Sequence, residues 1–109
     1  MGDRKMKFKL VICIASFALA TQATALECGP YDVISIQSQS TNVIVRVEDD
    51  SGKYWKNLGL YTDDWVNSYQ SLAQQALAAD KSVVLRFASD HDCSSSDYTT
   101  ATQMIRIVK

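Results

Sequence analysis

Residues 63–80 read DDWVNSYQSLAQQALAAD, and they decide the fold because here apolar residues recur at helical spacing. At about 100° per residue, one continuous arc holds the apolar and aromatic side chains, which are Trp65, Val66, Tyr69, Leu72, Ala73, Ala76 and Leu77. We expect this arc, including the Trp, to be buried. We also expect Asp63 or Asp64 to cap the first turn, since a carboxylate there accepts unpaired backbone N–H groups.

The opposite arc of this helix is polar, and no residue between Asp64 and Asp80 carries a charge. A helix face that lies in water usually carries charged side chains. Because like charges repel at short range, an uncharged face suits close packing against copies of the same helix. The sequence therefore predicts an assembly surface formed by Asn67, Ser71, Gln74, Gln75 and Ala78.

Five segments around the helix have strand-like patterns, and they are residues 32–37, 43–48, 53–60, 81–88 and 102–108. In the second of them, Val43, Val45 and Val47 alternate with other residues and so share one face. Residues 89–100 are expected to form a polar loop. The order β-β-β-α-β-β indicates a mainly β domain with one helix. We interpret it as a five-stranded OB-fold barrel whose helix caps one open end.

The first 25 residues have the pattern of a signal peptide. Four basic residues, Arg4, Lys5, Lys7 and Lys9, precede the apolar run LVICIASFALA at residues 10–20. This run is too short for a membrane span, which needs about 20 residues. Small residues at Ala23 and Ala25 predict cleavage after Ala25. We therefore expect residues 26–109 to be a single domain, secreted or periplasmic, with no transmembrane span.

Charge and cysteine content narrow the function further. Residues 26–109 hold seven Lys and Arg against eleven Asp and Glu, a net charge of −4 that disfavours nucleic acid and anionic membranes as partners. They keep two cysteines, Cys28 and Cys93, which in a small exported domain most often form one disulfide. Such a bond would stabilise the fold by roughly 4 kcal/mol. The alternative is two free thiols that act as ligands or nucleophiles.

Aromatic and acidic residues form a candidate sugar site, because apolar sugar faces pack on aromatic rings and sugar hydroxyls need acceptors. The candidates are Tyr54, Trp55, Trp65 and Tyr98 for stacking, and Asp49, Asp50, Asn57 and Asp63 for hydrogen bonding. The alternative assigns one Trp to the core and the aspartates to turns and caps. Arg46, Arg86 and Arg106 are expected to point outward, either for solubility or to pair with acidic loops of a neighbouring subunit.

His91 lies two residues before Cys93 and is expected to be solvated in the loop. A metal site needs three or four converging ligands, and this region does not supply them. His91 could serve Ser94 as a general base, yet the sequence indicates neither an orienting group nor an oxyanion hole. We therefore expect no metal, no cofactor and no enzymatic activity.

The stretch WVNSYQSLAQQALAADKSVVLRFASDHDC at residues 65–93, with the final strand MIRIVK, resembles the B subunits of pentameric bacterial toxins. The Shiga-type subunit is the most similar in size and pattern, and the pertussis-like and subtilase cytotoxin B subunits are similar from the helix to the next strand. The resemblance implies an OB fold, a ring of five subunits whose helices line a pore, and binding of host-cell glycans. The Cys28–Cys93 pair matches the disulfide placement of that family.

Trp65 matches a Trp near the helix start that contacts sugar in the Shiga-type subunit. The Asp-rich first hairpin of that subunit has no counterpart, because this chain reads SQSTN at residues 38–42. The leading hypothesis is therefore an exported, non-enzymatic subunit that binds host-cell glycans as a pentameric ring and delivers a separate catalytic A-type subunit. The alternative is a monomeric periplasmic binding or inhibitor domain that acts on a partner protein.

Overall fold

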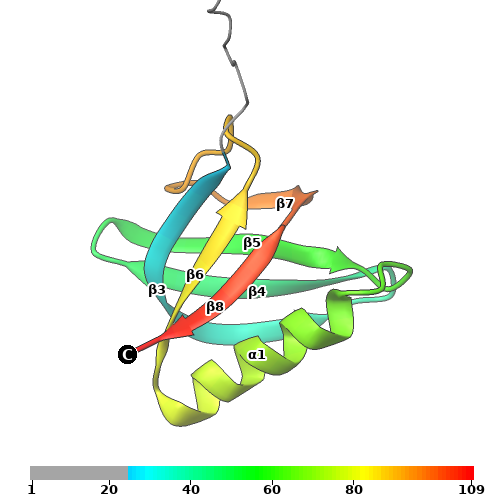
Figure 1. Ribbon diagram of the computed structural model, residues 1–109, viewed down its shortest axis with the longest axis horizontal. Coiled ribbons are helices and arrows are strands. Elements are labelled where there is room, and N and C mark those ends of the chain that lie inside the picture. Colours follow the sequence, from blue (N-terminus) through cyan, green and yellow to red (C-terminus); the bar gives the residue numbers. More distant parts are fainter. Residues whose placement is uncertain (1–24) are drawn as a thin grey trace, which may run out of the picture.

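A computed structural model describes residues 25–109 as one curled sheet with a helix packed against it (Figure 1). The predicted signal peptide, apart from Ala25, lies outside these residues. The elements, in chain order, are β3 (Leu26–Ser38), β4 (Asn42–Asp49), β5 (Gly52–Leu60), α1 (Val66–Ala79), β6 (Ser82–Phe87), β7 (Asp97–Ala101) and β8 (Met104–Val108). The prediction of a mainly β domain with one helix is confirmed for this part of the chain.

The strands lie in the order β7-β5-β4-β3-β6-β8, and the sheet curls into a half-barrel (Figure 1). β3, β4 and β5 form an antiparallel meander, β6 and β8 continue it antiparallel beyond β3, and β7 joins β5 in parallel. The two edge strands β7 and β8 are therefore consecutive in the chain. Between them, the Thr102 N–H donates to the Asn57 carbonyl at 2.9 Å and the Gln103 N–H donates to the Arg86 carbonyl at 2.7 Å. This short link thus bonds to strands from both sides of the sheet.

The predicted count of five strands is wrong, because residues 97–101 form a sixth strand, β7, inside the expected polar loop. Its sequence DYTTA has no apolar alternation, and its place in the sheet comes from backbone pairing with β5. β3 also begins earlier than expected, at Leu26, because its first three residues pair with β6. Alternation of apolar and polar residues in the sequence reflects burial of side chains. Strands held mainly by backbone hydrogen bonds lack this alternation and are therefore hard to predict from the sequence.

The interior is filled by residues that alternate along the strands. The fully buried side chains on β4 and β6 include Val43, Val45, Val47, Val83, Leu85 and Phe87. The helix adds Val66, Ala73 and Ala76, whose small side chains let it lie close to the sheet. Trp65 and Leu77 are each 42% exposed, so the prediction that they are buried is wrong. The buried arc of the helix is narrower than the apolar arc of the sequence.

The start of α1 has no side-chain cap. The Asp63 carboxylate instead accepts a hydrogen bond from the Leu60 N–H at 2.9 Å, and the Asp63 carbonyl accepts one from the Val66 N–H at 3.3 Å. The prediction that Asp63 or Asp64 caps the helix is therefore wrong. Asp63 closes the turn that joins β5 to the helix.

Gly29 sits at a bulge in β3, where the pairing with β6 shifts between Cys28 and Tyr31. Its φ is +119°, a conformation that disfavours any residue with a side chain. A Cβ added at Gly29 would lie 2.8 Å from the Val83 carbonyl oxygen, which belongs to the backbone of β6 and cannot turn away. Glycine at this position therefore allows β3 to bend across the sheet.

We predict that Gly29→Ala lowers the free energy of unfolding by about 2 kcal/mol or more, measured by urea denaturation, because it combines backbone strain with a steric clash. Gly52→Ala is the matched control. Gly52 also has a positive φ, +156°, but its closest neighbour is the side-chain hydroxyl of Tyr54 at 3.2 Å and not a backbone atom. An equal loss of stability in both variants would show that the close approach of the β6 backbone to Gly29 does not add to the effect of the substitution.

Candidate functional site

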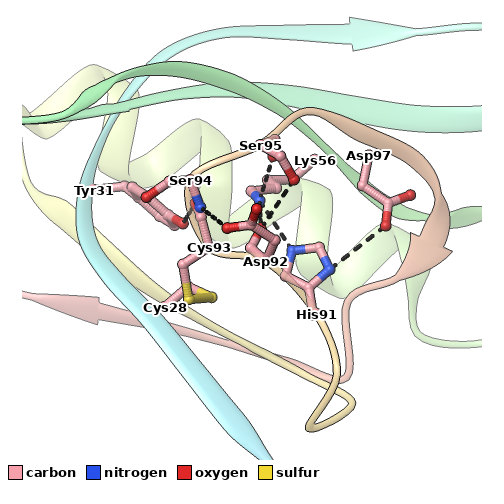
Figure 2. The surroundings of a disulfide bond; sticks show 9 residues. All are labelled: Cys28, Tyr31, Lys56, His91, Asp92, Cys93, Ser94, Ser95 and Asp97. Atoms are coloured by element: carbon pink, nitrogen blue, oxygen red, sulfur yellow. Dashed lines mark hydrogen bonds and ion pairs between the residues drawn. A yellow bond between two sulfur atoms is a disulfide. The ribbon is translucent and has the colours of Figure 1, made fainter.

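A fully buried lysine, Lys56, lies beneath the loop of residues 88–96 that joins β6 to β7, which we call the disulfide loop (Figure 2). Its ammonium group donates to the Ser95 carbonyl at 2.7 Å and to the Asp92 carbonyl at 3.1 Å. Its third partner is Nε2 of His91 at 2.9 Å. Three acceptors match the three N–H donors of a lysine ammonium. The charge is thus buried with every donor satisfied.

Strand alternation puts Lys56 inside. Tyr54, Lys56 and Leu58 occupy alternate positions of β5, and all three are buried. The ammonium nitrogen lies 5.7 Å from the centre of the Tyr54 ring and 5.5 Å from that of Phe87, distances at which a cation is attracted to an aromatic face. Burial lowers the pKa of Lys56, while the nearby carboxylates of Asp92, Asp97 and Asp49 raise it.

His91 is buried, so the prediction of a solvated loop residue is wrong. Its ring stacks on Phe87 with centroids 3.8 Å apart and planes 14° apart. Because Lys56 has only donors, Nε2 of His91 must accept, which assigns the proton of the neutral ring to Nδ1. Nδ1 lies 3.5 Å from the carboxylate of Asp97. Burial lowers the pKa of His91, and the Lys56 charge lowers it further.

The carboxylate of Asp97 holds the other end of this cluster. It accepts the backbone N–H groups of Thr99 and Thr100, each at 2.9 Å, and the Thr99 hydroxyl at 3.2 Å. The hydrogen bonds from Thr100, followed by those from Thr99, hold the pKa of Asp97 well below its usual range. Asp97 is therefore ionised where β7 begins, beside the imidazole of His91.

The predicted Cys28–Cys93 disulfide is confirmed, and it ties β3 to the disulfide loop (Figure 2). Beside it, the Tyr31 hydroxyl donates to the Cys93 carbonyl at 2.6 Å. Burial raises the pKa of Tyr31, so this hydroxyl keeps its proton. The loop is thus fixed to β3 by the disulfide, to β5 by Lys56 and to β7 by Asp97.

The polar groups of this cluster bond to one another within the fold. Nε2 of His91 is occupied by Lys56, so it does not activate Ser94, and all three N–H donors of Lys56 are used. Within residues 25–109 no three His, Cys, Asp or Glu side chains lie close enough together to hold a metal ion. Lys56 is not among the residues predicted from the sequence, although its place between Tyr54 and Leu58 in the strand alternation is a signal for burial.

Four of the candidate sugar-binding residues lie in two pairs, one at each end of the β4–β5 pair (Figure 1). Asp49 and Asp50 lie in the β4–β5 hairpin, beside a hollow of about 510 Å³ that is lined by Gly29, Pro30, Asp32, Glu48, Asp49, Asp50 and Ser51. Asp49 also accepts the Ser51 and Gly52 N–H groups at 2.9 and 3.2 Å, as a turn residue would. These lining residues include four carboxylates and no basic side chain.

At the other end, three apolar and aromatic side chains are exposed where β5 leads into α1. They are Leu60, Tyr61 and Trp65, which are 48%, 44% and 42% exposed, and we call them the aromatic corner. The indole nitrogen of Trp65 and the carboxylate of Asp63 both lie close to Gly59. This corner therefore combines aromatic faces with a carboxylate acceptor.

The remaining candidates occupy other places. Tyr54 is buried in a T-shaped contact with the ring of Tyr31, and Asn57 is buried with its side chain bonded to Asn42, Gly59 and Thr99. Trp55 is half-buried, with the guanidinium of Arg46 5.9 Å from its ring centre. Tyr98 is 51% exposed on β7. The structure therefore does not bring the eight candidates together in one site.

Two of the strand arginines pair within the chain. Arg86 and Arg106 each lie 2.9 Å from the carboxylate of Glu27, across the β3, β6 and β8 strands. The hydrogen bonds from Arg106, followed by those from Arg86, lower the pKa of Glu27. Their acidic partner is therefore on the same chain, whereas the sequence predicted a role in solubility or a pairing with a neighbouring subunit.

Comparisons of the chain with protein-family models, with curated proteins and with solved structures each found no match. The helix that the structure describes is not long and apolar enough to cross a membrane. The functional proposal therefore rests on the sequence and on the geometry of the described residues.

We predict that Lys56→Met lowers the free energy of unfolding by about 3 kcal/mol, because it leaves the Ser95 and Asp92 carbonyls and His91 without their donor. Lys53→Met is the control, since Lys53 lies exposed on the same strand. Chemical denaturation monitored by circular dichroism measures both variants. Equal stability of the two variants would show that the buried ammonium contributes nothing to the fold.

Proposed function

We propose that residues 26–109 form an OB fold that serves as an exported, non-enzymatic B-type subunit, which binds host-cell glycans as a pentameric ring. An OB fold is a five-stranded, partly open Greek-key barrel. If β7 and β8 are counted as two halves of one bent strand, five strands remain. That bent strand then joins β5 on one side of the sheet to β6 on the other. This pairing supports the fold that the toxin resemblance implies.

The observation that carries the assembly proposal is the uncharged outer face of α1. Its five predicted assembly residues, Asn67, Ser71, Gln74, Gln75 and Ala78, are all exposed, and Leu77 beside them is 42% exposed. A face without charge can approach a copy of itself without repulsion, and its Ser and Gln side chains can hydrogen-bond across the interface. Five such helices side by side would form the wall of a central pore.

Sugar binding is proposed for the aromatic corner. Exposed rings offer apolar faces for stacking, and the neighbouring Asp63 carboxylate offers an acceptor for sugar hydroxyls. The hollow at Asp49 and Asp50 is a second candidate, and its carboxylates favour neutral sugars because they repel anionic ones. Weak sites on one face of a ring gain strength when several bind together.

A B-type subunit delivers the catalytic activity of another protein, so this proposal includes a separate A-type partner. The bonding of Lys56 and His91 supports the non-enzymatic part, since both groups are occupied within the fold. Export is proposed from the signal-like residues 1–25 of the sequence. The aromatic corner would equally suit a partner protein, which keeps a monomeric periplasmic inhibitor as the second candidate.

We predict that Ser71→Glu and Gln74→Glu each disperse the ring while the fold stays intact, because each places five like charges around one axis. Sedimentation velocity measures the mass, and circular dichroism monitors the fold. Ser94→Glu is the control, since it adds the same charge on the exposed disulfide loop. Variants that keep the same oligomeric mass would remove α1 as the assembly surface, and a monomeric wild-type chain would refute the ring.

We predict that a glycan array shows binding to neutral sugars, and that Trp65→Ala weakens it at least about tenfold by removing the stacking surface. Trp65→Phe is the matched control, because it keeps an aromatic ring at the same position. Binding that survives Trp65→Ala would move the site away from the aromatic corner. A monomer that binds no sugar but retains a specific periplasmic protein would favour the inhibitor.

A further inference from the structure

His91 is the one histidine in the sequence, and the fold uses it as a neutral hydrogen-bond acceptor for a cation. We propose that His91 is an acid-sensitive latch, whose protonation sets two cations 2.9 Å apart and releases the disulfide loop from Lys56. This device is a property of the fold and does not depend on the proposed sugar binding or ring.

The atom that takes up the added proton determines which contact of His91 is lost. Nδ1 already carries the proton of the neutral ring and faces Asp97, so a second proton can bind only at Nε2. Nε2 is the atom that accepts from the Lys56 ammonium (Figure 2). Protonation therefore replaces the hydrogen bond by a direct contact between two N–H donors. The contact between Nδ1 of His91 and the Asp97 carboxylate is present whether or not the ring is protonated, and protonation makes it an ion pair.

Charged groups from several elements surround this pair. Lys56 faces His91 from β5, Asp97 faces it from β7, and Asp90 and Asp92 act from the loop itself, while Asp49 on β4 acts on Lys56. The packing partner on β6 is Phe87, which is uncharged. The carboxylates favour the imidazolium, but burial and Lys56 outweigh them and lower the pKa of His91. Lys56, which lies closest to a ring nitrogen, therefore opposes protonation of His91.

Release is local because the loop has a second anchor. Cys93 stays bonded to Cys28, and the Tyr31 hydroxyl stays bonded to the Cys93 carbonyl. Residues on either side of Cys93 can move once His91 leaves the Phe87 ring and the Asp92 and Ser95 carbonyls part from the Lys56 ammonium. Opening then exposes Phe87 and Lys56, both fully buried in the closed state, while the strand ladder remains paired.

The direction with pH follows from the lowered pKa. A solvated histidine has a pKa of about 6.5, so the open loop binds a proton more readily than the closed loop. The closed loop is therefore fully stable above about pH 6.5 and loses stability as pH falls through the lower pKa of the closed state. Each pKa unit between the two states corresponds to about a tenfold rise in the opening equilibrium at acid pH.

Two measurements on the oxidised chain test this latch. A proton NMR titration of the single imidazole is expected to give a pKa below 6.5, the value of a free histidine. Amide hydrogen exchange, corrected for its intrinsic pH dependence, is expected to show lower protection of the His91 amide at pH 5 than at pH 7.5, by a factor that matches the pKa difference. The amides of the β3–β4 ladder serve as the internal reference, and their protection should not change.

His91→Gln is the informative variant, because its side-chain oxygen can still accept from Lys56 but does not titrate. Loop protection in this variant is expected to be the same at pH 5 and pH 7.5. Asp50→Asn, which removes an exposed carboxylate of the β4–β5 hairpin, is expected to keep the wild-type pH response. An imidazole pKa at or above 6.5, or the same acid response in His91→Gln, would overturn the latch, and the titration decides even if that variant does not fold.

Discussion

The ammonium group of Lys56 is the constraint on which the rest of the structure depends. A buried lysine is tolerated only when its donors are satisfied, and here the acceptors come from a loop 35 to 39 residues later in the chain. The polar segment after β6 must therefore fold back over β5, and this places Asp97 where β7 can pair beside that strand. The disulfide to β3 holds the same loop from the opposite side.

Because Lys56 and His91 are bonded within the fold, the functional proposal rests on the outer surfaces of the domain. The polar groups of Lys56, His91 and the disulfide loop are bonded to one another in the interior. The surfaces that remain are the uncharged face of α1, the aromatic corner and the acidic hollow at the β4–β5 hairpin. The proposed assembly rests on the first of these surfaces, and the proposed glycan binding rests on the other two.

The sequence predicted well where burial produces a pattern. The valines of β4 and the apolar residues of α1 located those elements, and two cysteines were enough to predict the disulfide. It failed where a residue's role depends on distant partners. β7 is placed by backbone bonds to β5, and His91 is buried because Lys56 and Phe87 meet it from other strands. Trp65 is exposed at the N-cap of α1, while the buried helix residues are Val66, Ala73 and Ala76.

Direct observation of the Lys56 ammonium is the measurement that tests this account most closely. Heteronuclear NMR of the labelled chain is expected to show slowly exchanging ammonium protons on Lys56, close in space to the His91 ring, with Nε2 of that ring unprotonated at neutral pH. Such signals would establish a buried, fully bonded charge beneath the disulfide loop. Lys56 protons that exchange as fast as those of exposed Lys53, or a proton on Nε2, would contradict it.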